Sequence, residues 1–177
     1  MLEQKLYPPI ANWLERFLDR HYRNAKNVIV EDTSRLTVAA FLAKHDLLRW
    51  RPEGRIFDIK VDITGAVLLP LRRQLIVKLA IVEVKVGAIN VRSFSQVLGY
   101  AKVVHPSHAF IISPKGWSSS LHQLVRDFNR VDVLEYAPGK HIIVAKWDSA
   151  SASIRPGEVL AYGQTIDRII KIAQSGG

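Results

Sequence analysis

The sequence predicts an α/β protein with a central mixed β-sheet flanked by helices. Segments with helical spacing of apolar residues alternate with short runs of β-branched residues, in the order helix, strands, helix, strand. This order is typical of a sheet that carries helices on both faces. The 177 residues are enough for one domain with a real hydrophobic core, and no linker or internal repeat divides them. We therefore expect a single domain over residues 1–177.

The first expected element is an amphipathic helix over residues 2–20. Its apolar residues recur at helical spacing and are Leu6, Tyr7, Ile10, Trp13, Leu14, Phe17 and Leu18. Pro8 and Pro9 fit best in a first turn, so the helix should begin near Tyr7 or be kinked there. Extending the helical period backwards places Glu3 in the middle of the apolar stripe. A frayed terminal carboxylate is the alternative interpretation of Glu3.

A short strand over residues 27–31 comes next, followed by a helix that Ser34 can cap and that runs to about Leu48. Residues 56–66 then alternate apolar with polar side chains, which predicts a strand with one apolar and one charged face.

A second strand, over residues 79–87, carries two opposite charges in an otherwise apolar run. Glu83 and Lys85 are two residues apart, so both project from one face, about 7 Å apart. Burying such charges costs several kcal/mol each unless they are paired or hold a metal. If the two strands form an antiparallel pair joined by a bend at 70–74, an Asp of the first strand meets Glu83 and Lys85. A simple ion pair on a half-exposed strand is the alternative.

A helix from about 94 to 104 should follow, capped by Asn90 or Ser93. Gln96 and Tyr100 are four residues apart on this helix, so they should point the same way.

The remaining elements continue the alternation of helices and strands. We expect a strand over 108–113, a helix over 121–128, a hairpin that pairs 131–136 with 141–147, and a last helix that contains Ile166 and Ile172.

The two charged strands resemble the bipartite motif of the PD-(D/E)XK nuclease superfamily. In that motif an Asp precedes an (Asp/Glu)-X-Lys strand, as Asp62 precedes Glu83-Val84-Lys85 by a gap of 20 residues. Val61 stands where the family signature often has Pro, a departure also seen in the Holliday-junction-resolvase-like members. Asp58 shares the predicted face of Asp62, but the Ile-Thr-Gly after Asp62 resembles the strand exit of the family.

The helix after the second strand adds to the resemblance. Gln96 and Tyr100 resemble the Gln-X-X-X-Tyr motif of the RecB-like branch of the superfamily. The resemblance covers about residues 1–115 and implies a restriction-endonuclease-like αβββαβ core, with an α/β extension over about 116–177.

The resemblance also implies an activity, a Mg²⁺- or Mn²⁺-dependent hydrolysis of phosphodiester bonds in DNA. Asp62, Glu83, the carbonyl of Val84 and a Glu from the first helix, Glu3, would bind the metal. Lys85 would position the attacking water. Gln96 and Tyr100 would orient this assembly or the substrate backbone. The alternative is a non-catalytic nucleic-acid-binding module, or a subunit that needs a partner, on the same scaffold.

Composition limits the other classes of function. The formal net charge is +9 and the isoelectric point is about 10.0, which favours a nucleic acid partner, here DNA. The absence of cysteine excludes disulfides, Cys-ligated zinc and thiol nucleophiles. No apolar run is long enough to span a bilayer and the N-terminus lacks a signal-peptide pattern, so we expect a cytoplasmic protein without a membrane partner. A homodimer is left open.

Overall fold

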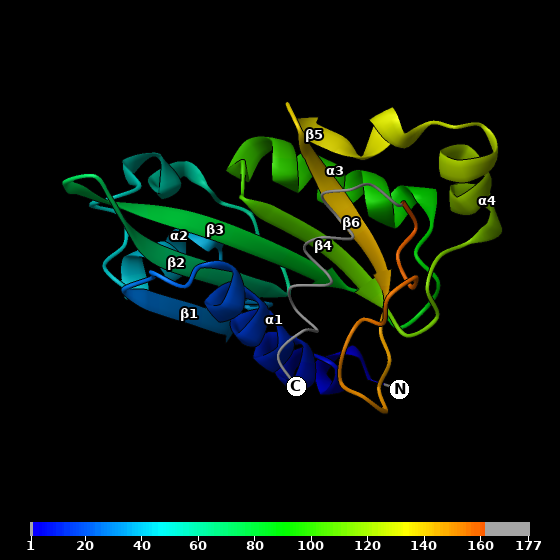
Figure 1. The fold of residues 1–177 in the computed structure, drawn as a ribbon, viewed down its shortest axis with the longest axis horizontal. Helices are drawn as coiled ribbons and strands as arrows, with labels where there is room; N and C mark the ends of the chain where they lie inside the picture. The colour runs from blue at the N-terminus through cyan, green and yellow to red at the C-terminus, as the bar shows by residue number, and fades with distance from the viewer. Residues whose placement is uncertain (1, 162–177) are drawn as a thin grey trace.

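The computed structural model describes residues 2–161, which form a β-sheet with helices on both faces (Figure 1). The predicted helix that contains Ile166 and Ile172 lies outside the described residues. The helices are α1 (Tyr7–His21), α2 (Val38–Lys44), α3 (Val91–Val104) and α4 (Ser119–His122). The strands are β1 (Asn27–Asp32), β2 (Ile63–Leu71), β3 (Gln74–Val84), β4 (His108–Ser113), β5 (Glu135–Ala137) and β6 (Lys140–Lys146). Short 3-10 turns occupy Glu3–Lys5, Pro52–Ile56 and Val131–Leu134, and a π turn occupies Gln123–Asp127.

The six strands lie in the order β1-β2-β3-β4-β6-β5. β4 pairs in parallel with β3 and β6, and the other neighbours pair antiparallel. The predicted α/β fold with a mixed sheet flanked by helices is therefore confirmed. Because β6 pairs with β4, the C-terminal part of the chain enlarges this same sheet.

Two apolar cores lie on opposite faces of the sheet. α1 packs on one face, against side chains that include Val82 and Val84 of β3. α2 and α3 cover the other face, against side chains that include Leu79 and Ile81. Since strand side chains alternate between faces, Glu83 lies on the face of α2 and α3. None of the helices in the described part of the chain is both long and apolar enough to cross a membrane.

The first helix begins at Tyr7, as the two prolines predicted. Pro8 and Pro9 occupy its first turn, where a missing N–H removes no helical hydrogen bond. Glu3 precedes the helix and lies in the 3-10 turn, so the predicted helical start at residue 2 was wrong.

The alternating segment that precedes Ile63 is not a strand, and this prediction was wrong. The amide of Val38 donates to the carbonyl of Ile59 at 2.8 Å, and the amide of Ala39 donates to the carbonyl of Phe57 at 3.0 Å. These carbonyls satisfy the free amides at the start of α2 instead of joining a β-ladder. Apolar and polar residues alternate here because one side of an extended loop is buried, and β2 begins only at Ile63.

The cap of α2 also differs from the prediction. The side chain and amide of Ser34 both bind Oδ1 of Asp32, at 2.7 and 3.0 Å, which builds a turn after β1. Thr37 caps the helix, because its hydroxyl accepts from the amide of Ala40 at 3.1 Å.

The predicted antiparallel pairing of the two charged strands is confirmed as β2 with β3. The connection is tighter than the predicted bend at 70–74, because Leu71 pairs with Gln74 and only Arg72 and Arg73 form the turn. Pro70 is tolerated within β2 because β1 stops pairing at Leu68, so no neighbour needs the missing N–H.

The C-terminal predictions hold in part. β5 and β6 form the expected hairpin around Gly139, whose φ of +71° suits the turn. Residues 131–134 form a 3-10 turn instead of a strand, and the predicted helix over 121–128 divides into the short α4 and the π turn.

Candidate active site at the end of the β2–β3 pair

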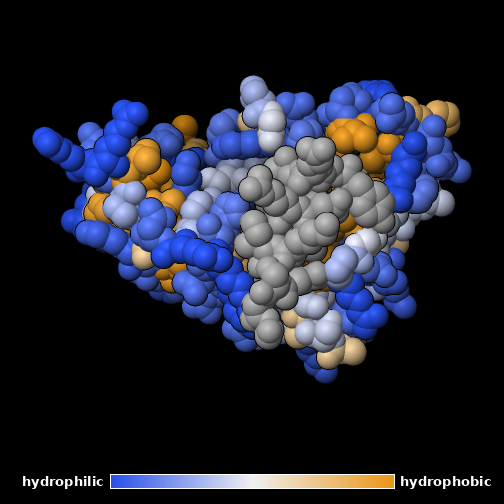
Figure 2. All heavy atoms as spheres, in the orientation of Figure 1, coloured by the Kyte–Doolittle hydropathy of each residue, from blue (hydrophilic) through white to orange (hydrophobic). Residues whose placement is uncertain are grey.

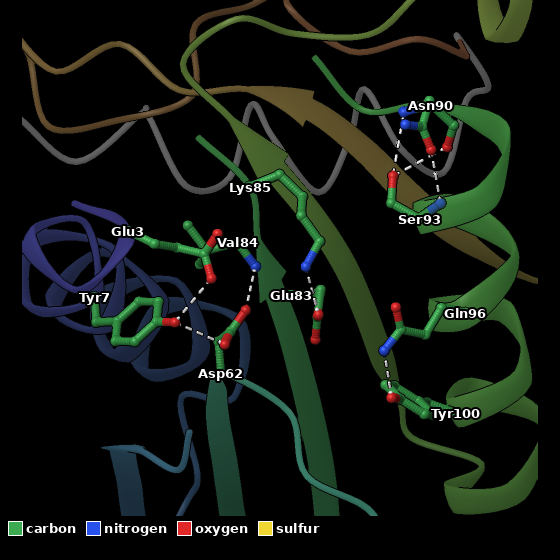
Figure 3. Close-up of polar contacts among 10 residues, drawn as sticks. All are labelled: Glu3, Tyr7, Asp62, Glu83, Val84, Lys85, Asn90, Ser93, Gln96 and Tyr100. Carbon is green, nitrogen blue, oxygen red and sulfur yellow. Dashed lines mark hydrogen bonds and ion pairs between the residues drawn. The ribbon is translucent and has the colours of Figure 1, made fainter. Parts of the chain in front are cut away.

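Asp62 and Glu83 meet where β2 begins and β3 ends (Figure 3). Ile63 pairs with Val82, so Asp62 lies one step further along, beside Glu83. Glu83 is 7% exposed and Asp62 is half-buried. Asp58, the competing acidic residue, is exposed in the loop that precedes β2.

The carboxylate of Asp62 completes the end of the sheet. The amide of Lys85 donates to Ile112 of β4 at 2.9 Å, so the amide of Val84 faces the opposite side, toward β2. There it donates to Oδ2 of Asp62 at 2.7 Å. The carbonyl of a strand residue faces the same edge as its amide, so the Val84 carbonyl lies on the Asp62 side.

Thr33 fixes the backbone around Asp62. Its amide donates to the carbonyl of Asp62 at 2.8 Å, and its hydroxyl donates to the carbonyl of Val61 at 2.9 Å. The same hydroxyl lies 2.8 Å from the hydroxyl of Thr64, and both threonines are fully buried. Thr33 was not predicted from the sequence, because its hydrogen bonds to the backbone around Asp62 join segments about 30 residues apart in the chain.

Tyr7 connects Asp62 to Glu3. Its hydroxyl is 2.8 Å from Oδ1 of Asp62 and 3.1 Å from Oε1 of Glu3 (Figure 3). A single hydroxyl proton serves both carboxylates, so the three groups form one hydrogen-bonded unit. The structure thus brings Glu3 to the site as expected. By its spacing Tyr7 belongs to the apolar stripe of the helix, and the role of its hydroxyl was not predicted, although a buried tyrosine hydroxyl usually finds a hydrogen-bond partner.

Lys85 forms an ion pair with Glu83, with Nζ 2.8 Å from Oε1. Burial alone would lower the pKa of Lys85, but the hydrogen bond to Glu83 and the negative charges of Glu83 and Asp62 outweigh it and raise this pKa. This pair also agrees with the plainer interpretation of the two residues as a structural ion pair.

Both central carboxylates resist ionisation. Burial raises the pKa of Glu83, and the charge of Asp62 raises it further. Burial also raises the pKa of Asp62, against the opposing effect of hydrogen bonds from Val84 and Tyr7. Two carboxylates held this close repel each other, and among the described residues Lys85 pairs with Glu83 alone. Carboxylates with pKa values perturbed in this way are common at functional sites.

Gln96 and Tyr100 extend from α3 toward the Glu83 side of the site (Figure 3). The amide of Gln96 donates to the hydroxyl of Tyr100, which confirms that they share one face of the helix. Among the described contacts, no hydrogen bond joins them to Glu83 or Lys85. Asn90 caps α3 through a reciprocal pair of hydrogen bonds with Ser93.

The candidate metal ligands at this site are the carboxylates of Asp62 and Glu83 and the carbonyl of Val84, and oxygens are the ligands that Mg²⁺ prefers. No three His, Asp or Glu side chains among residues 2–161 are grouped closely enough to hold a metal by themselves. Mg²⁺ needs only one or two protein carboxylates because it keeps several waters. Asp62, Glu83 and the carbonyl of Val84 therefore suit a hard divalent ion.

Comparisons of the chain with protein-family models, with curated proteins and with solved structures found no match. The PD-(D/E)XK relationship therefore remains a prediction that rests on the motifs.

Proposed function

We propose that this protein is a metal-dependent nuclease of the PD-(D/E)XK type that hydrolyses phosphodiester bonds in DNA. One observation carries the proposal: the buried carboxylate of Glu83 and the half-buried carboxylate of Asp62 converge from adjacent strand ends, although the charge of Asp62 raises the pKa of Glu83. A purely structural site would have little reason to keep them together.

Asp62, Glu83 and the carbonyl of Val84 would hold Mg²⁺ or Mn²⁺, with Glu3 in reach through Tyr7. Such an ion supplies Lewis acidity and lowers the pKa of a bound water. The protein contributes a fixed carboxylate geometry, because Thr33 and Tyr7 hold Asp62 from its backbone and its side chain.

Lys85 would position the attacking water or stabilise negative charge that develops on the phosphate. Its ammonium is held at the site by Glu83 and faces the same side of the sheet. Gln96 and Tyr100 offer hydrogen-bonding groups on the neighbouring wall, where they would orient the substrate backbone.

The net charge of +9 supports DNA as the partner, since it attracts a polyanion. The cysteine-free sequence fits a protein that works in the reducing cytoplasm.

A non-catalytic DNA-binding module, or a subunit that needs a partner, is the second candidate. The Glu83–Lys85 ion pair favours it, because this pair already neutralises one of the carboxylates.

Cleavage assays with Mg²⁺, Mn²⁺ or a chelator decide between the two. Labelled single-stranded, duplex, flapped and four-way DNA would be incubated with the wild type and with Glu83→Gln. We expect metal-dependent cleavage that Glu83→Gln abolishes without loss of DNA binding. Asp58→Asn is the matched control, since it removes an exposed carboxylate outside the site. If the wild type binds DNA but cleaves no substrate, the second candidate function, without catalysis by this chain alone, is favoured.

A further inference from the structure

The β2–β3 hairpin extends beyond both of its neighbours in the sheet. β1 stops pairing with β2 at Leu68, and β4 starts pairing with β3 only at Ala80. The hairpin continues past both limits until Leu71 pairs with Gln74. Its tip therefore projects from the sheet, at the left of Figure 1.

The tip carries two adjacent arginines, Arg72 and Arg73, beside the exposed Leu71. Both arginines are exposed, and neither forms a salt bridge with any described residue. Figure 2 shows hydrophilic side chains projecting at this end of the molecule.

The turn itself breaks the local rule for a two-residue hairpin. Arg72 has φ +55°, a left-handed conformation that favours glycine. Two neighbouring like charges in such a turn add repulsion. Where a sequence sacrifices local stability in this way, a function is the expected compensation.

The charge of the protein is concentrated in the part of the chain that contains this hairpin. Residues 63–126 contain eight Lys and Arg residues, and Glu83 is their single acidic residue. Four of these eight basic residues lie on the β2–β3 hairpin or directly after it, and they are Arg72, Arg73, Lys78 and Lys85.

The hairpin tip and the candidate active site lie at opposite ends of one ladder. Gln74 pairs at the tip, and Glu83 lies nine residues further along β3. At about 3.3 Å per strand residue, the two ends are roughly 30 Å apart. One turn of B-DNA is about 34 Å, so a duplex that is bound at the candidate site and runs parallel to the hairpin, outside the helices that cover the sheet, has a second phosphate position at the level of the tip.

We propose that Arg72 and Arg73 bind the phosphate backbone of duplex DNA about one helical turn from the bond at the Asp62–Glu83 site. This inference rests on the proposed function. The affinity of the protein for DNA would then depend on the length of duplex on one side of that bond. The contact carries no sequence preference, because it is made to the backbone.

Binding is measured by fluorescence anisotropy on random-sequence duplexes of increasing length, with a chelator present so that no strand is cut. Arg72→Gly/Arg73→Ser removes both charges and installs residues that a two-residue turn favours. Arg72→Lys/Arg73→Lys keeps the charges. Arg16→Ser/Arg130→Ser removes the same formal charge from two exposed arginines outside the hairpin, of which Arg130 forms a salt bridge with Asp132.

Wild-type affinity should rise once the duplex exceeds about 12 base pairs, since one helical turn is then available beside the site. Arg72→Gly/Arg73→Ser should lose this rise, and its slope of log K against log salt should be smaller by about two. At 0.1 M salt its affinity should fall roughly 10- to 100-fold. Its melting temperature should equal or exceed that of the wild type, so misfolding cannot explain the loss.

The hairpin inference is overturned if Arg72→Gly/Arg73→Ser keeps the length dependence and the salt slope, or if Arg16→Ser/Arg130→Ser loses them equally. Failure of the proposed function is separate. Length-dependent binding without any cleavage would sustain the hairpin contact and reject the nuclease. If cleavage depends on Glu83 but Arg72→Gly/Arg73→Ser binds DNA like the wild type, the nuclease function is supported and the hairpin contact is rejected.

Discussion

The carboxylate of Asp62 receives the amide hydrogen of Val84 at 2.7 Å, where a strand would normally supply a backbone carbonyl. One side chain thus ends the β2–β3 ladder and supplies half of the carboxylate pair. Because this carboxylate is half-buried and close to Glu83, structural and chemical demands on Asp62 oppose each other.

Replacing Asp62 by Asn should separate these demands. A raised pKa means that the folded protein binds more protons than the unfolded chain at pH values above about 4, so ionisation of Asp62 and Glu83 costs stability as pH rises. Asp62→Asn should lower the cleavage rate at least about 100-fold, because it removes a carboxylate charge from the proposed metal site. It should also raise the free energy of unfolding at pH 8 and flatten its fall above about pH 4.

Urea unfolding at several pH values checks this, with Asp58→Asn as the control that should leave the pH dependence unchanged. If Asp62→Asn is less stable than the wild type at pH 8, the hydrogen bonds to Val84 and Tyr7 outweigh the repulsion, and the strained carboxylate pair is refuted.

Replacing Thr33 by Val should damage the site through the backbone of Asp62. The variant leaves the carbonyl of Val61 and the hydroxyl of Thr64 buried without their partner, at a cost of about 1–3 kcal/mol. Cleavage should fall further than the folded fraction. Thr37→Ala is the matched control, because losing the α2 cap costs about 1 kcal/mol without touching Asp62. Equal activity of the two variants per folded molecule would remove Thr33 from the site.

The sequence could predict the elements whose signals are local. The start of α1 at Tyr7 follows from two prolines, and the antiparallel pairing of β2 with β3 follows from two apolar runs joined by a short polar connection. The choice of Asp62 over Asp58 came from the resemblance to the nuclease motif. The extent of β2 could not be predicted in this way. Phe57 and Ile59 alternate like strand residues, yet their carbonyls bind the start of α2, a competition that only the tertiary structure decides.

The same limit applies to the residues around the candidate site. Spacing within single elements predicted that Glu83 shares a face with Lys85 and that Gln96 shares one with Tyr100, and the family resemblance assigned the four residues to one site. The contribution of Thr33 depends on which loop packs beside which strand, and periodicity carries no information about that.

His108 should make stability depend on pH between 6.5 and 4. Burial, together with the smaller effects of the charges of His21, Lys140 and Lys78, lowers its pKa to about 3. Its Nε2 lies 2.8 Å from the hydroxyl of Tyr22. The unfolded chain takes up a proton near pH 6.5 whereas the folded protein does not, so stability is complete above that pH and falls below it.

The loss for wild type should be about 3 kcal/mol between pH 6.5 and pH 4 from His108 alone. His108→Gln keeps a hydrogen-bonding group for Tyr22 and should remove this part of the slope, as measured by urea unfolding. The idea fails if the variant and the wild type lose stability in parallel over this range.

Tyr7→Phe should shift the pH dependence of cleavage. The hydroxyl of Tyr7 lies 2.8 Å from Asp62, and its hydrogen bond lowers the pKa of that carboxyl against the larger effect of burial. Without the hydroxyl, the pKa of Asp62 rises further, so less of it is ionised at a given pH. The acid limb of kcat/KM should therefore move to higher pH, while activity on the alkaline side is largely kept. Tyr22→Phe is the control on the same polypeptide segment, because it removes a hydroxyl that lies 2.8 Å from Nε2 of His108 and that is not among the described hydrogen-bond partners of Asp62. Its acid limb should coincide with that of the wild type. If Tyr7→Phe instead lowers kcat/KM equally at every pH, Tyr7 only supports the packing of α1, and the hydroxyl has no part in setting the charge of Asp62.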